Sequence, residues 1–194
     1  MFSVWKTARL APIFKTDDET ECRNYRPVSL LSIPSNILET EINDILVRHI
    51  YKDNNLGSNR QWAYRSGYST EYLLTHLTET WRRTLDSGKV VAAAFIAFKK
   101  AFDSVSHATL LKKLRKDWHH KIATGLVKYL NGSQQFTVLN GVRSDLLLVT
   151  ISILQGSILG PTLFNIFTND LHRWSNQGRY ICSPMTKQTW QSHS

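Results

Sequence analysis

Residues 92–107 read AAAFIAFKKAFDSVSH, and the apolar part of this stretch decides how the chain around it is interpreted. The run from Val90 to Phe98 is short, rich in β-branched and aromatic side chains, and preceded by glycine, which predicts a buried strand. A strand that ends in an acid and leads into a basic turn is a common support for a divalent cation. At position 97, where such an acid would project, the chain has alanine.

The turn after this strand contains Lys99, Lys100 and Asp103. A helix is expected from about His107, so Asp103 has the structural interpretation of a turn or helix-cap residue. A metal-ligand role is the alternative, and the position alone favours the structural one.

Length and composition describe a globular protein with a basic surface. The 194 residues are enough for one large domain or two small lobes, and 42% are hydrophobic and 20% charged. The net charge of +9 favours a polyanionic partner, either nucleic acid or an anionic membrane surface.

Cys22 and Cys182 are far apart and lack metal-ligand spacing, which favours a reducing compartment. We find no signal peptide and no apolar run long enough to span a bilayer, so we expect an intracellular protein, cytoplasmic or nuclear.

Periodicity places the other elements. Strands are predicted at residues 5–15 and 25–33, paired as a hairpin, and at 134–139 and 146–153, joined through Asn140-Gly141. Helices are predicted from Pro34 to Ile50, after the N-cap Ser69, over about 107–118 and 122–130, and from Gly160. The inward stripes of the first two helices are expected to be Ile37, Leu38, Ile42, Ile45, Leu46 and Ile50, and Leu73, Leu74, Leu77, Trp81 and Leu85.

Two further stretches have the composition of ligand sites. Residues 155–161, QGSILGP, place two glycines and a serine between a strand and a helix, where backbone can approach an anion closely. Lys15 and Arg26 on the hairpin, with Arg60 and Arg65 in the next loop, can clamp phosphates. The alternatives are an ordinary strand-to-helix turn and a solvated basic face.

Together, these stretches resemble the reverse transcriptase domain of a non-LTR, LINE-type retrotransposon. The similar segments occur in the family's order over most of residues 5–172: WKTARLAPIFK, NYRPVSLLSI, QWAYRSGYST, AFIAFKKAFDSVSH, VRSDLLLVT and LQGSILGPTLFNIFTNDL. The resemblance implies an α+β fold that is a partial right-hand polymerase, with fingers at 1–89, an incomplete palm at 90–172, no thumb and an aberrant tail at 173–194. A group II intron-type or other cellular reverse transcriptase is the alternative family.

The resemblance also implies a reaction and the residues that serve it. The family is a nucleotidyltransferase that copies an RNA template onto a DNA primer from dNTPs, with two Mg²⁺ ions held by aspartates and no membrane involved. The implied nucleotide-binding residues are Lys15, Arg26, Phe98, Phe102, Gln155, Gly156 and Ser157. The implied nucleic-acid contacts are Arg65, Lys99 and Lys100.

The chain departs from the family at its catalytic acids. The family's strand carries a metal-binding aspartate at the position of Ala97, and Asp103 matches a secondary acid of the motif. After NDL the family reaches an Ala-Asp-Asp hairpin, whereas no acid occurs here after Asp170. Read two bases later, the codons of residues 181–186 can spell Leu-Phe-Ala-Asp-Asp, which indicates a frameshift near 172–179. We therefore expect a pseudoenzyme with no intact metal site, or alternatively a non-enzymatic nucleic-acid-binding remnant.

Overall fold

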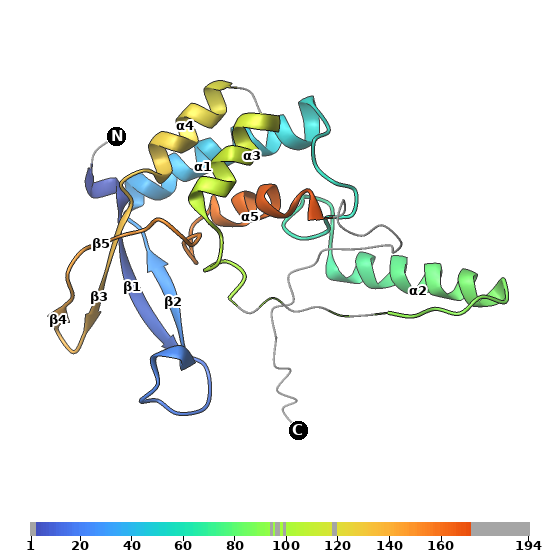
Figure 1. Ribbon diagram of the computed structural model, residues 1–194, viewed down its shortest axis with the longest axis horizontal. Helices are drawn as coiled ribbons and strands as arrows, with labels where there is room; N and C mark the ends of the chain where they lie inside the picture. The colour runs from blue at the N-terminus through green and yellow to red at the C-terminus, as the bar shows by residue number, and fades with distance from the viewer. Residues whose placement is uncertain (1–2, 94, 96–97, 99, 118–119, 172–194) are drawn as a thin grey trace. The chain divides into compact units, whose positions relative to one another are not determined.

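The computed structural model describes residues 3–93, 95, 98, 100–117 and 120–171 (Figure 1). Ala97, Lys99 and the predicted tail at 173–194 lie outside the described residues. The chain divides into two compact units. The first unit contains residues 1–57 and 100–168, and the second contains residues 58–99 and 169–194.

A small mixed sheet forms one part of the first unit. Strands β1 (Thr7–Phe14) and β2 (Tyr25–Leu30) pair antiparallel, which confirms the predicted hairpin. Strand β3 (Gln134–Leu139) pairs parallel to β1 on its other side, and the short β4 (Val142–Arg143) and β5 (Leu147–Leu148) both pair with β3. The order is therefore β2-β1-β3-β4, with β5 beside β3. Local periodicity contains no signal for the parallel β1–β3 pairing.

Asn140 and Gly141 make the predicted two-residue turn. Their φ angles are 50° and 81°, and Leu139 faces Val142 across it, as a type I′ hairpin requires. The long strand predicted at 146–153 is wrong, because only β5 and a single bridge between Ser106 and Ile151 form there. The reason is that β3 begins at Gln134, which pairs with Leu148, so residues 149–153 extend past the start of β3 and have no strand there to pair with.

Four helices enclose the core of the first unit. Helix α1 (Ile33–Val47) continues as a π-helical turn, Arg48–Asp53, and packs with α3 (His107–Asp117), α4 (His120–Leu130) and α5 (Gly160–Thr168). Figure 1 shows these helices grouped together while the β1–β2 hairpin extends away from them. The buried side chains are Leu46, Ile50, Val105, Leu110, Leu114, Ala123, Leu126, Tyr129, Leu130, Ile153, Leu159, Leu163, Phe164 and Ile166.

The predicted inward stripe of α1 is wrong at two positions. Ile37 and Ile45 are 62% and 55% exposed, whereas Glu39 is fully buried. Leu46 and Ile50 are buried as predicted. The helix is thus turned so that a carboxylate faces the interior. That orientation is stable only if the carboxylate finds donors there.

Glu39 has such donors from two other elements. One carboxylate oxygen, Oε2, accepts hydrogen bonds from the Ser157 hydroxyl (2.8 Å) and from the backbone N–H groups of Ile158 (2.8 Å) and Leu159 (3.3 Å). The other oxygen accepts a hydrogen bond from the hydroxyl of Tyr129 on α4. Glu39 therefore joins α1, α4 and the loop that precedes α5.

Helix α2 (Thr70–Asp86) belongs to the second unit. Ser69 is its N-cap as predicted, and its hydroxyl accepts a hydrogen bond from the backbone N–H of Tyr72 at 3.2 Å. Leu73 is buried, but Leu74 and Leu85 are 55% and 58% exposed, so the predicted stripe is wrong there. An amphipathic stripe is buried only where another element packs on it.

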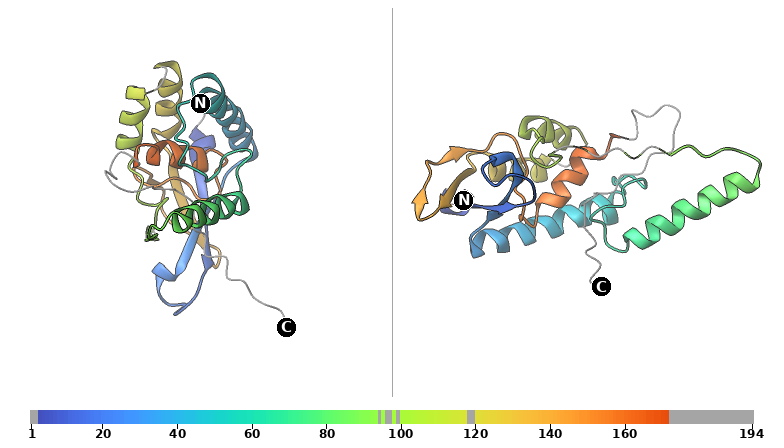
Figure 2. Two further views of the ribbon diagram at one scale, coloured as in Figure 1. Left: turned by 90° about the vertical axis from the view of Figure 1, so that its right-hand side faces the viewer. Right: turned by 90° about the horizontal axis from the view of Figure 1, so that it is seen from below.

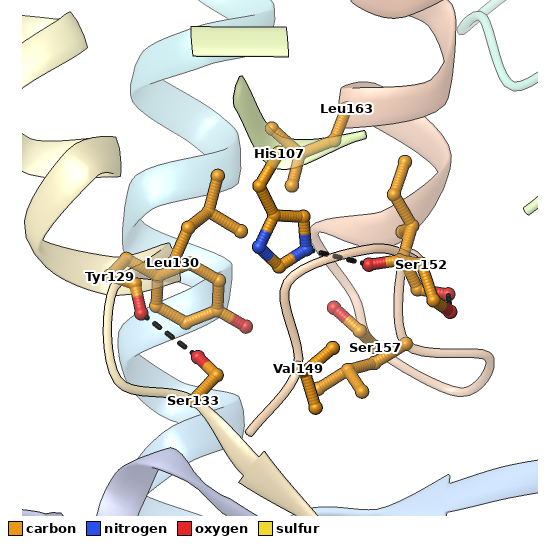
Figure 3. Close-up of a pocket in the computed structure, with 10 residues that line it drawn as sticks. His107, Tyr129, Leu130, Ser133, Val149, Ser152, Ser157 and Leu163 are labelled. Carbon is orange, nitrogen blue, oxygen red and sulfur yellow. Dashed lines mark hydrogen bonds between the residues drawn. The ribbon is translucent and has the colours of Figure 1, made fainter. Parts of the chain in front are cut away.

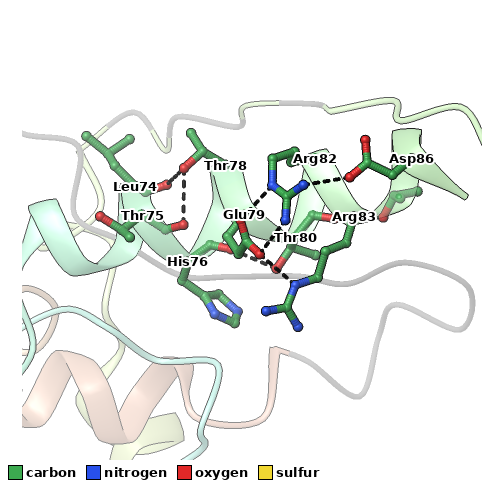
Figure 4. Close-up of polar contacts among 10 residues, drawn as sticks. Leu74, Thr75, His76, Thr78, Glu79, Thr80, Arg82, Arg83 and Asp86 are labelled. Carbon is green, nitrogen blue, oxygen red and sulfur yellow. Dashed lines mark hydrogen bonds and ion pairs between the residues drawn. The ribbon is translucent and has the colours of Figure 1, made fainter.

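An ion-pair network covers the polar side of α2 (Figure 4). Arg82 contacts Glu79 at 2.9 Å and Asp86 at 2.6 Å, and Arg83 contacts Glu79 at 2.7 Å. Hydrogen bonds from Arg82 and Arg83 lower the pKa of Glu79 to about 2. These pairs are one turn apart on the helix, the spacing at which opposite charges stabilise it.

The buried strand predicted at Val90–Phe98 is wrong for the residues that the structure describes there. Residues 90–93, 95 and 98 have no strand conformation, and Val90, Phe95 and Phe98 are 91%, 67% and 58% exposed. A strand exists only through the hydrogen bonds of a neighbouring strand. Among the described residues, no strand pairs with this segment.

We predict that Glu39→Ala lowers the free energy of unfolding by about 3 kcal/mol or more, because it leaves several buried donors without an acceptor. The control is Glu41→Ala, which removes an exposed carboxylate from the same helix and should be close to neutral. Urea unfolding of both variants measures the difference. Equal midpoints for the two variants would contradict the role given to Glu39.

Titration of Tyr129 is expected to lower the free energy of unfolding at alkaline pH. Its pKa is raised by burial, and further by the charge of Glu39 and its hydrogen bond to that carboxylate. A raised folded-state pKa contributes stability that is fully present below the unfolded value of 10.0 and is lost as pH rises above it. We expect the unfolding midpoint of the wild type to fall above pH 10 more steeply than that of Tyr129→Phe. Parallel pH profiles would show that Tyr129 is not the titrating group.

Candidate nucleotide and nucleic-acid site

The basic hairpin presents its two predicted phosphate-binding residues on one face. Arg26 pairs with Ile13 across the hairpin, and Lys15 follows Ile13 by two residues, so Lys15 and Arg26 lie on the same side. The backbone N–H of Lys15 donates to the carbonyl of Asn24 at 3.0 Å, which extends the pairing past the end of β1. Both side chains are exposed. This face can therefore receive a polyanion.

The Gln155–Gly156–Ser157 loop lies directly against β2. The backbone N–H of Ser29 donates to the carbonyl of Gln155 at 2.6 Å. Gly156 has a φ of 103°, and a Cβ there would lie 2.8 Å from the Ser29 carbonyl oxygen and 3.5 Å from Val28 Cγ1. Val28 is on the same side of β2 as Arg26. The loop and the basic face of the hairpin are thus neighbours, and only glycine fits at this approach.

Asp103 connects two of the predicted motifs. Its Oδ1 accepts a hydrogen bond from Gln155 Nε2 at 2.9 Å. The backbone supports this link, because Ile153 N–H donates to the Phe102 carbonyl at 2.9 Å. Of the two structural roles predicted for Asp103, the turn is confirmed and the helix cap is wrong, since Ser106 Oγ accepts from the N–H of Thr109 at the start of α3. Asp103 instead lies in the preceding turn and positions the side chain of Gln155.

Ser157 faces the interior rather than solvent. It is 8% exposed, and its hydroxyl donates to Glu39 and accepts from the N–H of Gly160 at 3.1 Å. Sequence reasoning missed Glu39. A signal was present, because Glu39 precedes Ile42 by three residues and Leu46 by seven, which places it on the buried stripe of the helix.

The other predicted residues are divided between the two units. In the first unit, Phe102 is half-buried and stacks on Phe164, with ring centres 4.7 Å apart, and Lys100 is exposed with a φ of 54°. In the second unit, Phe98 is exposed, and the Arg65 guanidinium lies 4.2 Å from the centre of the Tyr68 ring. Within the first unit, Asp103 contacts Gln155 and Gly156 lies against Val28 and Ser29 of β2, whereas Lys15 and Arg26 lie further along the hairpin.

A cavity beside this loop is too small for a nucleotide (Figure 3). Its volume is about 20 Å³, room for roughly one water molecule. His107 closes one side, with Nε2 2.7 Å from the Ser152 carbonyl, and that carbonyl can only accept the hydrogen bond. Tyr129, Ser133 and Ser157 line the cavity. This cavity therefore cannot hold the nucleotide that the family pattern implies.

The described residues do not fit a magnesium site. Magnesium requires several hard oxygen ligands in octahedral geometry. No group of three or more His, Cys, Asp or Glu side chains in the described ranges could hold a metal. Asp103 is the one described carboxylate of the predicted site, and its Oδ1 already accepts a hydrogen bond from Gln155. No described helix is long and apolar enough to cross a membrane.

We predict that Gly156→Ala destabilises the protein by about 1 kcal/mol more than Gly132→Ala. Both glycines have positive φ, so each variant carries backbone strain of about 1–2 kcal/mol. Only at Gly156 does the added Cβ also meet a backbone oxygen, whereas the space at Gly132 is open. Urea unfolding gives the difference, and hydrogen exchange at the Ser29 amide should accelerate only in Gly156→Ala. Equal destabilisation would mean that the loop does not lie against β2.

Comparison with known proteins identifies the family. The family model for reverse transcriptase (RNA-dependent DNA polymerase) matches residues 13–183. The probable RNA-directed DNA polymerase from transposon BS of Drosophila melanogaster is 32% identical over 173 residues, which cover 86% of this chain and 18% of that protein. The RNA-directed DNA polymerase from mobile element jockey of the same species is 27% identical to this chain. The probable RNA-directed DNA polymerase from transposon X-element, also of that species, is 27% identical as well. They too cover 86% of this chain.

The chain spans 18% of the length of each of these relatives. The match nevertheless covers most of the chain and includes Lys15, strand β2, the turn at Asp103 and the loop at Gly156. The chain therefore belongs to the reverse transcriptase family, as a reverse transcriptase domain of the non-LTR, LINE type.

Proposed function

We propose that this reverse transcriptase domain no longer synthesises DNA and that it binds nucleic acid through its basic surfaces. The proposed loss of activity rests on the alanine at position 97, where the family has a metal-binding aspartate. The stretch that follows Asn169-Asp170-Leu171, where the family carries its other two catalytic acids, contains no acid, which supports the same conclusion. In the family, the Mg²⁺ ions activate the primer hydroxyl and stabilise the leaving group.

The size of the expected loss follows from the charge removed. One missing metal-ligating carboxylate removes several kcal/mol of transition-state stabilisation, which at about 1.4 kcal/mol per factor of ten is on the order of a thousandfold or more. Two further missing acids leave no set of oxygen ligands for the ions. Synthesis should therefore fall below detection.

The proposed architecture has the fingers portion of a right-hand polymerase at 1–89, the palm portion at 90–172 and an aberrant tail at 173–194. Its proposed partners are an RNA template and a DNA primer inside the cell. Lys15 and Arg26 are proposed to bind the phosphates of a nucleotide, with Gln155 and Gly156 behind it. The shared side of Lys15 and Arg26 on the hairpin, and the position of the Gln155–Gly156 loop against β2, support this assignment. Phe98, Phe102, Ser157, Arg65, Lys99 and Lys100 remain assigned by the family pattern.

We predict no primer extension on an RNA template with Mg²⁺ and all four dNTPs. The variant Ala97→Asp should be equally inactive, because it restores only one of three acids. A gel-based extension assay with an active reverse transcriptase as the positive control measures both. Extension above background by the wild type would overturn the proposed loss of activity.

We also predict that the wild type binds a primer–template at low salt. The double variant Lys15→Gln/Arg26→Gln should bind more weakly at 50 mM salt and should lower the log–log salt slope by about 1.8, as expected for two lost phosphate contacts, so that the wild type loses about tenfold more affinity than the variant between 50 and 200 mM salt. Arg23→Gln is the matched control, because Arg23 lies on the same hairpin but is paired with Glu21 at 3.3 Å. Fluorescence anisotropy gives the affinities. If the control loses as much affinity as the double variant, the face formed by Lys15 and Arg26 is not the binding surface.

A further inference from the structure

Helix α3 carries one basic residue with a clear structural role. Leu110 and Leu114 are fully buried and fix which side of the helix faces the core. Lys113 extends over the end of α5, where its Nζ donates a hydrogen bond to the Phe167 carbonyl at 2.6 Å. The same Nζ lies 4.9 Å from the centre of the Phe167 ring. A cation at the carbonyl end of a helix is stabilising. Lys113 is therefore part of the packing of α3 on α5.

Three other cations of α3 have no such role. Lys112, Arg115 and Lys116 are exposed. Their spacings of three and four residues place them side by side on the outward surface, which we term the α3 basic face. None of the three forms an ion pair with another side chain that the structure describes.

The contrast with α2 makes this arrangement informative. On α2, Arg82 and Arg83 are neutralised within the helix by Glu79 and Asp86. On α3, like charges at i and i+4 repel each other, which destabilises the helix. The helix dipole favours Arg115 and Lys116 in the last turn, but its effect does not extend to Lys112. A bound polyanion would offset this repulsion.

We infer that the α3 basic face, formed by Lys112, Arg115 and Lys116, is a second contact surface for the sugar-phosphate backbone of nucleic acid. The rise from Lys112 to Lys116 is about 6 Å, comparable to two nucleotide steps along a strand. Flexible cations on an exposed helix contact phosphates without reading bases, so this surface has no sequence preference. The inference rests on the proposed binding of nucleic acid.

This surface is separate from the hairpin. In Figure 1 and the left view of Figure 2, α3 and the tip of the β1–β2 hairpin lie at opposite ends of the first unit. The two surfaces share no residue and no described hydrogen bond. Their contributions to binding should therefore be additive.

The test compares two triple variants that remove equal charge. One is Lys112→Gln/Arg115→Gln/Lys116→Gln, and the control is Arg48→Gln/Lys52→Gln/Lys89→Gln, which removes three exposed cations elsewhere. A labelled single-stranded poly(U) RNA is titrated at several salt concentrations from about 50 to 200 mM, and urea midpoints confirm that both variants fold. The α3 variant should lower the log–log salt slope by about 2, so the wild type loses about 20-fold more affinity than this variant over that range. The control should keep the wild-type slope.

A wild-type slope in the α3 variant, or an equal loss in the control, would overturn the inference while leaving the hairpin site intact. No RNA binding by the wild type at about 50 mM salt would overturn both this inference and the proposed binding function. Binding to phosphatidylserine vesicles that depends on the same three cations, with unchanged RNA binding, would assign the face to a membrane and overturn the inference.

Discussion

The buried carboxylate of Glu39 is the interaction on which the arrangement of the first unit depends. A charge in the interior is costly unless hydrogen bonds replace its water. Here a tyrosine on α4 and a serine with two backbone N–H groups before α5 supply those bonds. A second polar contact between α1 and α5, from Thr162 to Asn43 at 2.5 Å, supports the same packing. The loop at Gly156 is consequently fixed against β2, where the Ser29–Gln155 hydrogen bond aligns it.

Elements with local signals could be predicted from the sequence. The β1–β2 hairpin follows from alternation around a polar turn, the Asn140-Gly141 turn from its need for positive φ, and α2 from the cap at Ser69. The parallel pairing of β1 with β3 could not be predicted, because it joins strands more than a hundred residues apart. The segment at Val90–Phe98 has strand composition, but composition does not supply the partner that a strand requires.

The candidate site could be predicted in part. Family motifs named Lys15, Arg26, Gln155 and Gly156, and the structure adds that Lys15 and Arg26 share one side of the hairpin and that the Gln155–Gly156 loop lies against β2. The motifs did not reveal that Asp103 binds the side chain of Gln155, because that contact spans 52 positions of the chain. Glu39 was missed because a carboxylate on a helix is expected to face water.

These features describe a reverse transcriptase domain whose structural contacts are formed although position 97 is alanine. The loop, the turn at Asp103 and the basic hairpin keep a defined arrangement within the first unit. Such contacts depend on packing and hydrogen bonds, whereas a metal site depends on a few charges that one base change can remove. A domain that has lost its chemistry, as we propose for this one, can still present basic surfaces to nucleic acid.

The most direct test of this account is the nucleotide sequence across codons 165–194 and the region downstream. The account predicts that the frame read two bases later spells Phe-Ala-Asp-Asp at codons 182–186 and continues as polymerase-like sequence. That result would identify a broken polymerase gene in which Ala97 is one lesion of several. A downstream sequence with no such motif in any frame would contradict the frameshift. The acids would then have been lost by another route, and nucleic-acid binding would become the better-supported function.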